Sequence, residues 1–178
     1  MVAANQRWRL LGACAEVLRE RGYAGTTVTN VTKVAVVSRA TFYRNFESVP
    51  GCILATYELA AENVLAVLEE ACEGEEGGGA STVEVLPVVL GFLETESALA
   101  HVLSDAALND VPGLPAARGE FTARCAALLT SSRGARGSGA GDRRARHLVR
   151  GMQGWLSMRL TSRRALGPPA DLAQILTL

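Results

Sequence analysis

Hydrophobic residues recur along the chain at steps of three and four positions, the spacing that gathers side chains on one face of an α-helix. In the first segment with this pattern, the apolar face consists of Leu10, Leu11, Cys14, Val17 and Leu18. No stretch of the sequence shows the sustained two-residue alternation of a half-buried strand. The pattern therefore predicts an all-α protein.

The first two helices are predicted over residues 5–21 and 27–34. The first is expected to stop at Gly22, because glycine favours the position just past the end of a helix. Thr26 and Thr27 follow, and either hydroxyl can accept a hydrogen bond from an N–H group at the start of the second helix. The inner face of this second helix is expected to consist of Val28, Val31, Val34 and Ala35.

A third short helix is predicted from Arg39 to Asn45, with Ser38 as its N-cap. Successive helical residues are rotated by about 100°. This rotation puts Arg39, Ala40, Tyr43 and Arg44 on one side, Phe42 and Phe46 on the other, and Thr41 on the exposed flank. Two phenylalanines four positions apart are spaced to anchor a helix to a core. The third helix is therefore expected to present a basic and polar face to solvent.

The rest of the chain predicts six further helices, separated by stretches rich in glycine and proline. Their expected bounds are Val49–Cys72, Thr82–Leu93 with a kink at Pro87, Ser97–Leu108, Ala116–Leu129, Asp142–Leu166 and Ala170–Leu178. Residues 73–79 and 131–141 are expected to be loops between them. The chain is thus expected to divide into a head, residues 1–48, and a larger helical body, residues 49–178.

Charge is distributed unevenly between these two parts. The chain has no net charge, but residues 1–47 carry seven basic and three acidic side chains, a net +4, and the remainder carries −4. A basic head on an acidic body fits a head that meets a polyanion.

The N-terminus lacks the charged and then apolar stretches of a signal peptide. The most apolar run, Val85–Leu93, is too short for a bilayer, which needs about 20 residues. Cys14, Cys52, Cys72 and Cys125 have neither metal-ligand nor disulfide-framework spacing, as is typical of reduced thiols in a cytosolic protein. A cytoplasmic protein that is nucleoid-associated when bound to DNA is expected.

A helix, a tight turn and a second short helix with an exposed basic face make the layout of a helix-turn-helix. Its second helix must fit a DNA major groove about 12 Å wide, while the preceding helices hold it against the phosphates. The predicted head has this layout between residues 27 and 45.

The stretch from Leu10 to Tyr57 resembles the TetR family of bacterial transcriptional regulators. The matching residues, in order and without a gap, are Glu20-Arg21-Gly22-Tyr23, Thr26-Thr27-Val28 and the run from Val37 to Ser48. The resemblance implies a helix-turn-helix DNA-binding head and a helical body that binds a ligand and dimerises. The body matches only in length and helix layout.

The resemblance also implies roles for individual residues of the head. Thr27 and Tyr43 correspond to phosphate contacts, and Ser38 to the cap of the recognition helix and a further phosphate contact. The groove-facing readers are implied to be Arg39, Ala40, Thr41 and Arg44. Arginine reading guanine, or a threonine methyl meeting a thymine methyl, is the usual chemistry of such positions.

Two positions depart from the family pattern. Glycine usually stands in the turn before the recognition helix, where this chain has Val36. A positive φ there would strain valine by about 1 kcal/mol. Many members also carry a phosphate-contacting lysine at the start of the fourth helix, where this chain has Val49 and Pro50. One phosphate contact is therefore expected to be missing.

For the body, the resemblance implies a homodimer formed by the last two helices and a pocket for an unknown small molecule, with no cofactor. Candidate pocket residues are Tyr57, Phe92, His101, Phe121, Cys125, Met152 and Trp155. Ligand binding is expected to shift the fourth helix and release the dimer from a palindromic operator. The resemblance also implies repression as the default mode.

Two other classes of function remain open at this point. An enzyme on a helical bundle is one, but no catalytic triad, paired carboxylates, phosphate loop or metal-ligand spacing supports it, so no enzymatic activity is expected. The other is a ligand-binding or scaffold protein that has lost specific DNA binding, which the departures at Val36 and Val49 would favour. Alanine at Arg39 and Arg44 separates a repressor from a scaffold.

Overall fold

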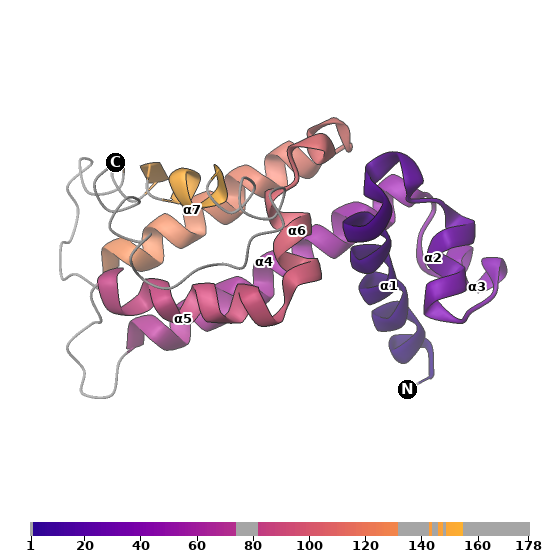
Figure 1. Cartoon of the computed structure of the whole chain (residues 1–178), viewed down its shortest axis with the longest axis horizontal. Helices are drawn as coiled ribbons and strands as arrows, with labels where there is room; N and C mark the ends of the chain where they lie inside the picture. Colours follow the sequence, from indigo (N-terminus) through magenta and orange to yellow (C-terminus); the bar gives the residue numbers. More distant parts are fainter. Residues whose placement is uncertain (1, 74–81, 132–142, 144–145, 148, 155–178) are drawn as a thin grey trace.

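The computed structural model describes residues 2–73 and 82–131, together with 143, 146–147 and 149–154 (Figure 1). Over these residues the chain is all-α, as the sequence predicts. Its elements are α1 (Val2–Gly25), α2 (Val28–Ala35), α3 (Arg39–Asn45), α4 (Val49–Glu73), α5 (Thr82–Thr95), α6 (Ser97–Ser104), the 3₁₀ helix η1 (Ala106–Asp110) and α7 (Leu114–Ser131). The described positions between 143 and 154 are also helical.

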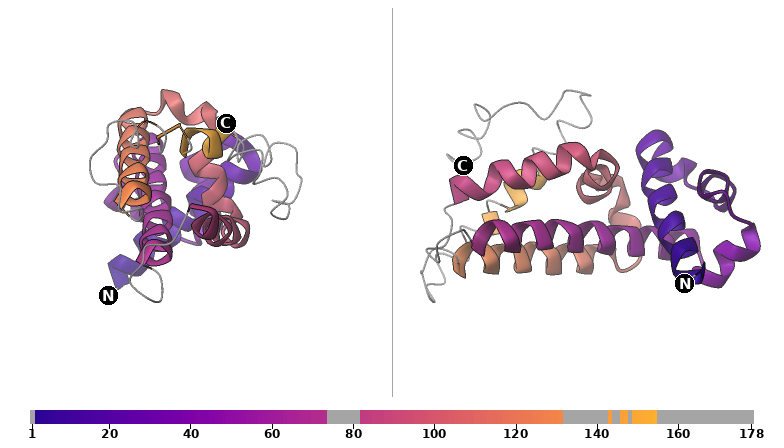
Figure 2. Two further views of the ribbon diagram at one scale, coloured as in Figure 1. Left: turned by 90° about the vertical axis from the view of Figure 1, so that its left-hand side faces the viewer. Right: turned by 90° about the horizontal axis from the view of Figure 1, so that it is seen from below.

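Helices α1, α2 and α3 form the head at one end of an elongated molecule (Figures 1 and 2). Helix α4 runs from the head into the body, where α5, α6 and α7 pack along it. By length and composition α4 could cross a membrane, as could α5 and α6 if this sharply bent pair counted as one span, but half of the most apolar window of α4 is buried inside the protein. Here α4 is the central helix of the fold.

Local capping explains where the helices of the head begin and end. Gly22 interrupts α1 with φ 66° and ψ −178°, which confirms the predicted stop in the helix. Thr27 caps α2, its hydroxyl accepting a hydrogen bond from the Asn30 N–H at 3.2 Å. Ser38 caps α3 in the same way through the Thr41 N–H at 3.0 Å. Bonds of this kind satisfy N–H groups that have no partner within their own helix.

The turn between α2 and α3 depends on Val36. This residue has φ 52° and ψ 51°, so valine occupies the left-handed conformation that the departure from glycine predicted. Its side chain is 76% exposed and gains little packing in return. The Arg9 guanidinium donates a hydrogen bond to the Val36 carbonyl at 3.1 Å, and this contact ties the turn to α1.

Four sequence-based expectations need correction. Val34 is 47% exposed rather than on the inner face of α2, which buries Val31, Thr32 and Ala35. The helix predicted over 97–108 ends at Ser104, because Asp105 is extended and its carboxylate caps the following 3₁₀ helix through the Ala107 N–H. The fourth helix ends at Glu73, and α7 begins at Leu114, since Pro115 is tolerated in a first helical turn.

The predicted final helix, 170–178, and most of 142–166 lie outside the described residues.

We expect Val36→Gly to stabilise the protein. The left-handed conformation costs valine about 1–2 kcal/mol, and glycine removes this cost. The greater freedom of glycine in the unfolded chain offsets about 0.5–1 kcal/mol of the stabilisation. The net expectation is a rise of about 0.5–1 kcal/mol in the free energy of unfolding, measured by urea denaturation. Val34→Gly is the matched control, because Val34 is also exposed but helical, and its replacement should destabilise. Equal effects of the two changes would contradict strain at Val36.

Candidate nucleic-acid interface and ligand cavity

Helix α3 lies at the outer end of the head (Figure 1). The face that it exposes is basic and polar. Arg39, Ala40 and Arg44 are exposed, and Tyr43 is 54% exposed. On the opposite side Phe42 and Phe46 are buried, with ring centroids 5.8 Å apart. The two phenylalanines therefore anchor the helix and leave its other face available to a partner.

Thr41 is not on the exposed flank as predicted. Its side chain is only 4% exposed, and its hydroxyl lies 3.0 Å from the Ser38 hydroxyl. The Arg44 guanidinium donates a hydrogen bond to the same Thr41 oxygen at 2.9 Å. A buried and internally bonded side chain disfavours the expectation that Thr41 reads the groove. Thr41 instead orients Arg44.

Two arginines of α1 hold the short helices and were missed from the sequence. Arg7 donates to the Asn45 carbonyl at 3.2 Å, and its guanidinium lies 4.5 Å from the centroid of the Phe46 ring. Arg9 donates to the Val36 carbonyl. Both carbonyls are at helix C-termini, where a positive charge is favourable. On a helical projection Arg9 lies on the polar side of α1, whereas Arg7 is in line with its apolar stripe, one turn before Leu10 and Leu11.

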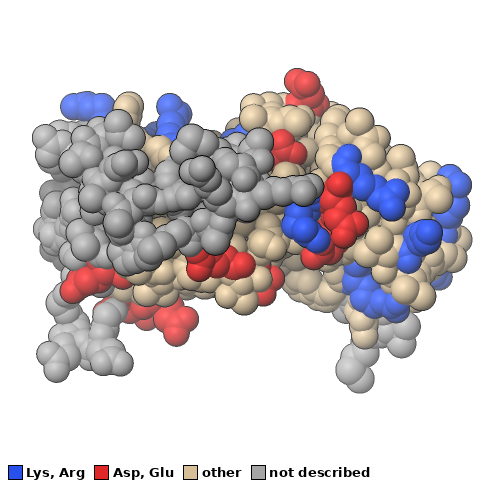
Figure 3. All heavy atoms as spheres, viewed as in Figure 1, with Lys and Arg blue, Asp and Glu red and all other residues tan. Residues whose placement is uncertain are grey.

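The charge asymmetry of the sequence is visible on the surface. Lys and Arg side chains gather over the head, whereas Asp and Glu side chains lie along the body (Figure 3). Within the head, Arg19 is paired with Glu16 at 2.7 Å. Exposed Lys33, Arg39 and Arg44 lie on α2 and α3.

The start of α4 keeps its cap without the family lysine. The Ser48 hydroxyl accepts a hydrogen bond from the Gly51 N–H at 3.2 Å. Val49 and Pro50 are half-buried there. Thr27, the other expected phosphate contact outside α3, is exposed at the start of α2.

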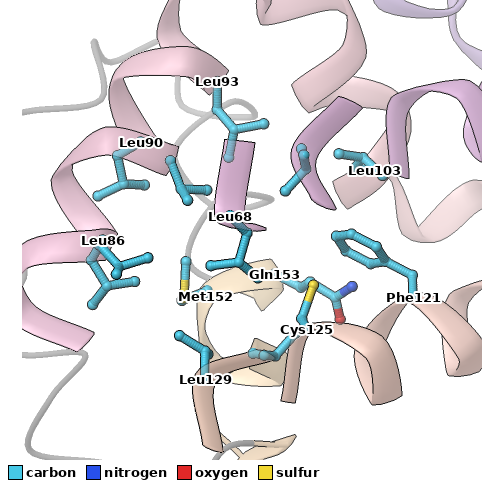
Figure 4. Close-up of a pocket in the computed structure, with 14 residues that line it drawn as sticks. Leu68, Leu86, Leu90, Leu93, Leu103, Phe121, Cys125, Leu129, Met152 and Gln153 are labelled. Carbon is cyan, nitrogen blue, oxygen red and sulfur yellow. The ribbon is translucent and has the colours of Figure 1, made fainter. Parts of the chain in front are cut away.

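The body contains a narrow apolar cavity of about 60 Å³ between α4, α5, α6, α7 and the described residues that follow α7 (Figure 4). Its wall consists of Val64, Leu68, Val85, Leu86, Val89, Leu90, Leu93, Leu103, Phe121, Cys125, Leu129, Val149, Met152 and Gln153. Gln153 is the polar member. Its buried Nε2 atom has no hydrogen-bond partner within the described part of the chain.

Only some of the expected pocket residues line this cavity. Phe121, Cys125 and Met152 do. Phe92 does not, because Val89 and Leu93 provide the inner face of α5. His101 does not either: it lies 3.7 Å from the Asp105 carboxylate on the outer side of α6, and Leu103 faces the cavity. Trp155 lies outside the described residues.

Tyr57 lies next to the cavity, not in its wall. Its ring meets Phe121 edge-on, with centroids 6.5 Å apart, and it forms the floor of a surface groove of about 310 Å³ between α4 and α7. Burial raises the pKa of Tyr57 to about 12, and the positive charge of Arg118 opposes that shift. Arg118 was not among the predicted pocket residues, although it lies on the same face of α7 as Phe121 and Cys125.

The described residues include no group of three His, Cys, Asp or Glu side chains that could hold a metal ion. The geometry is that of a protein with an exposed recognition helix and an apolar cavity.

The chain is similar to known transcriptional regulators in the sequence of its head and in its fold. Residues 10–55 match the family model described as bacterial regulatory proteins, tetR family. No curated protein is significantly similar to the chain.

Several solved structures share the fold over nearly the whole chain. A transcriptional regulator from Rhodococcus sp. Rha1 is 24% identical, with a TM-score of 0.77 over 96% of this chain and 91% of that one. The regulator FadR from Bacillus subtilis, solved with stearoyl-CoA, is 19% identical, with a TM-score of 0.74 over 96% of each chain. The multidrug binding protein EbrR, complexed with imidazole, is 21% identical, with a TM-score of 0.67 over 97% of this chain and 93% of that one.

Thr41→Val tests the internal bonds of α3. The change keeps the shape of the side chain but removes the oxygen that accepts from Arg44 and pairs with Ser38. The free energy of unfolding should fall by about 1 kcal/mol in urea denaturation. Thr29→Val, an exposed position on α2, is the control and should change it by less than about 0.5 kcal/mol. If both variants behave alike, the hydroxyl of Thr41 has no structural role.

Proposed function

We propose that the chain is a TetR-family transcriptional regulator, a cytoplasmic repressor that binds a palindromic operator as a dimer and releases it when a small molecule enters the body. The proposal rests on which side chains of α3 are exposed. The helix exposes Arg39, Ala40, Tyr43 and Arg44, while its buried phenylalanines, Phe42 and Phe46, anchor it to the core.

The proposed DNA contacts divide by position on the head. Arg39, Ala40 and Arg44 face the major groove, with Arg44 held in place by Thr41. Thr27, Ser38 and Tyr43 contact phosphates through exposed hydroxyl groups at the edges of the helices. A scaffold without DNA binding is the weaker alternative, because the turn forms even with valine in the strained position.

The proposed dimer follows from the DNA target. A palindromic operator matches a protein with two-fold symmetry, whose two recognition helices meet half-sites about one helical turn apart. In the proposed division, residues 1–48 bind DNA and residues 49–178 bind the ligand and dimerise. Residues 142–166 and 170–178 form the proposed interface.

The cavity supports the ligand part of the proposal. FadR and EbrR, which share this fold, were solved with small molecules bound. The cavity here, about 60 Å³, is smaller than the about 300–1,000 Å³ typical of ligand pockets. A ligand therefore enters by moving helices apart. Since α4 and α6 both contact α1, such movement reaches the head and changes the spacing of the recognition helices.

Arginine-to-alanine variants test the DNA-binding surface. Arg39→Ala and Arg44→Ala should each weaken operator binding by about 10- to 100-fold, because a base contact by arginine contributes about 1–3 kcal/mol. The measurement is fluorescence anisotropy with the DNA that flanks the protein's own gene, in excess non-specific DNA.

Arg19→Ala is the matched control for these variants. It removes the same charge from the head, but Arg19 is already paired with Glu16. The operator affinity of the Arg19→Ala variant should stay within about threefold of that of the wild type, since exposed ion pairs contribute little. If all three variants bind as the wild type does, the scaffold alternative is correct. If the wild type itself does not bind, selection from random DNA decides between a distant operator and an inactive head.

A further inference from the structure

Two buried hydrogen-bond donors in the body have no partner, and they lie together. The Tyr57 hydroxyl and the Arg118 Nε are both buried and unbonded within the described part of the chain. The guanidinium carbon of Arg118 is 5.7 Å from the centroid of the Tyr57 ring, and the side chain of Tyr57 is fully buried. Arg118 also acts on the Tyr57 hydroxyl, but neither this hydroxyl nor the Nε has a hydrogen bond of good geometry. Because buried polar groups are almost always satisfied, the pair leaves room for a further acceptor.

The charge of Arg118 is also uncompensated. Its two terminal nitrogens donate to neutral acceptors, the Asn109 side-chain oxygen at 2.6 Å and the Asp105 carbonyl at 3.0 Å. The ion pairs found among the described residues do not include Arg118, and the Asp105 carboxylate is turned toward His101. A half-buried guanidinium without a carboxylate favours an anionic partner.

Helix geometry connects this pair with the apolar cavity. With about 100° per residue, Tyr57, Val64 and Leu68 lie within about 40° of one another around α4. On α7 the same holds for Arg118, Phe121, Cys125 and Leu129, which lie within about 80°. Tyr57 and Arg118 therefore continue the two faces that line the cavity, on the side of Phe121 that is nearer the head.

The wall of the cavity is apolar except at Gln153. Leu86, Leu90 and Leu93 lie on one side of it, and the Gln153 amide lies on the side of Phe121 and Cys125 (Figure 4). The Phe121 ring belongs to the cavity wall and also contacts Tyr57. The Phe121 ring therefore lies between the cavity and the two donors.

We infer that the cavity and the Tyr57–Arg118 pair form one binding site for an amphipathic monocarboxylate, whose apolar tail fills the cavity and whose carboxylate accepts hydrogen bonds from the Tyr57 hydroxyl and the Arg118 Nε. This inference rests on the proposed ligand-released repressor and names the class of its effector. The tail is required, because Glu58, Glu62 and Glu120 line the outer groove beside Tyr57 and disfavour a small free anion.

The same arginine connects the site with the head. Arg118 holds the end of α6 and η1 through Asp105 and Asn109, and α6 packs on α1. A carboxylate that draws the guanidinium toward Tyr57 pulls on these bonds. Occupation of the anchor therefore changes how α6 supports α1.

The test is calorimetric titration of the full chain with decanoate, decanol, decylamine and acetate. Decanoate should bind at least about tenfold more tightly than decanol, because hydrogen bonds to an ionised acceptor are about twice as strong as neutral ones. Decylamine and acetate should not bind measurably. Decanoate should also release operator DNA at lower concentration than decanol.

Tyr57→Phe isolates the anchor. It removes one hydroxyl without a partner and keeps the ring, so thermal stability should not fall. The preference for decanoate over decanol should fall by about fivefold or more, because the carboxylate loses a stronger hydrogen bond than the alcohol does. Tyr23→Phe, the same change at a half-buried tyrosine of the head, is the control and should keep the full preference.

The remaining outcomes separate the anchor from the repressor. Equal binding of decanoate and decanol by the wild type overturns the carboxylate anchor but leaves a repressor with an apolar effector. A Tyr57→Phe variant that loses stability and keeps the preference shows that a buried water satisfies the hydroxyl, and overturns it too. Binding of neither compound, by protein that binds its operator, overturns the amphipathic site while the DNA-binding function stands.

Discussion

The structure depends on the packing of α4, which is shared between the two parts of the molecule. Its first turns are buried against α1 through Cys52 and Ile53, and its later turns provide Val64 and Leu68 to the cavity wall. A close-packed interior transmits displacement, because side chains cannot be moved without moving their neighbours. A single rigid helix therefore belongs to the core of the head and to the wall of the cavity at the same time.

The head could be predicted closely because its signals are local. Thr27, Ser38 and Gly22 act within a few residues of themselves, so their positions in the sequence define where α1, α2 and α3 begin or end.

The errors at Thr41 and Val34 have a different origin. A helical projection treats all residues on one side as equally exposed, but the Thr41 hydroxyl is turned back onto Ser38 and Arg44. Side-chain hydrogen bonds of this kind have no periodic signature.

The body could be predicted only as a set of helices. Apolar periodicity identifies a buried face but not the neighbour it packs against, so Phe92 and His101 were as plausible as Phe121 and Cys125. Arg118 was missed for the opposite reason: a single arginine in a helical segment usually indicates a solvated face. Its role depends on Asn109, on the Asp105 carbonyl and on Tyr57, and the fold brings these together from three elements.

The internal bonds of the head also change what its charge means. Of the seven basic residues in this region, Arg7 and Arg9 are bound to backbone carbonyls and Arg19 is paired with glutamate. A protein displaces condensed counterions from DNA only with the cations that it places on phosphates. The number of ions released on binding should therefore follow the exposed residues of α2 and α3, and fall well short of the basic residues in the sequence.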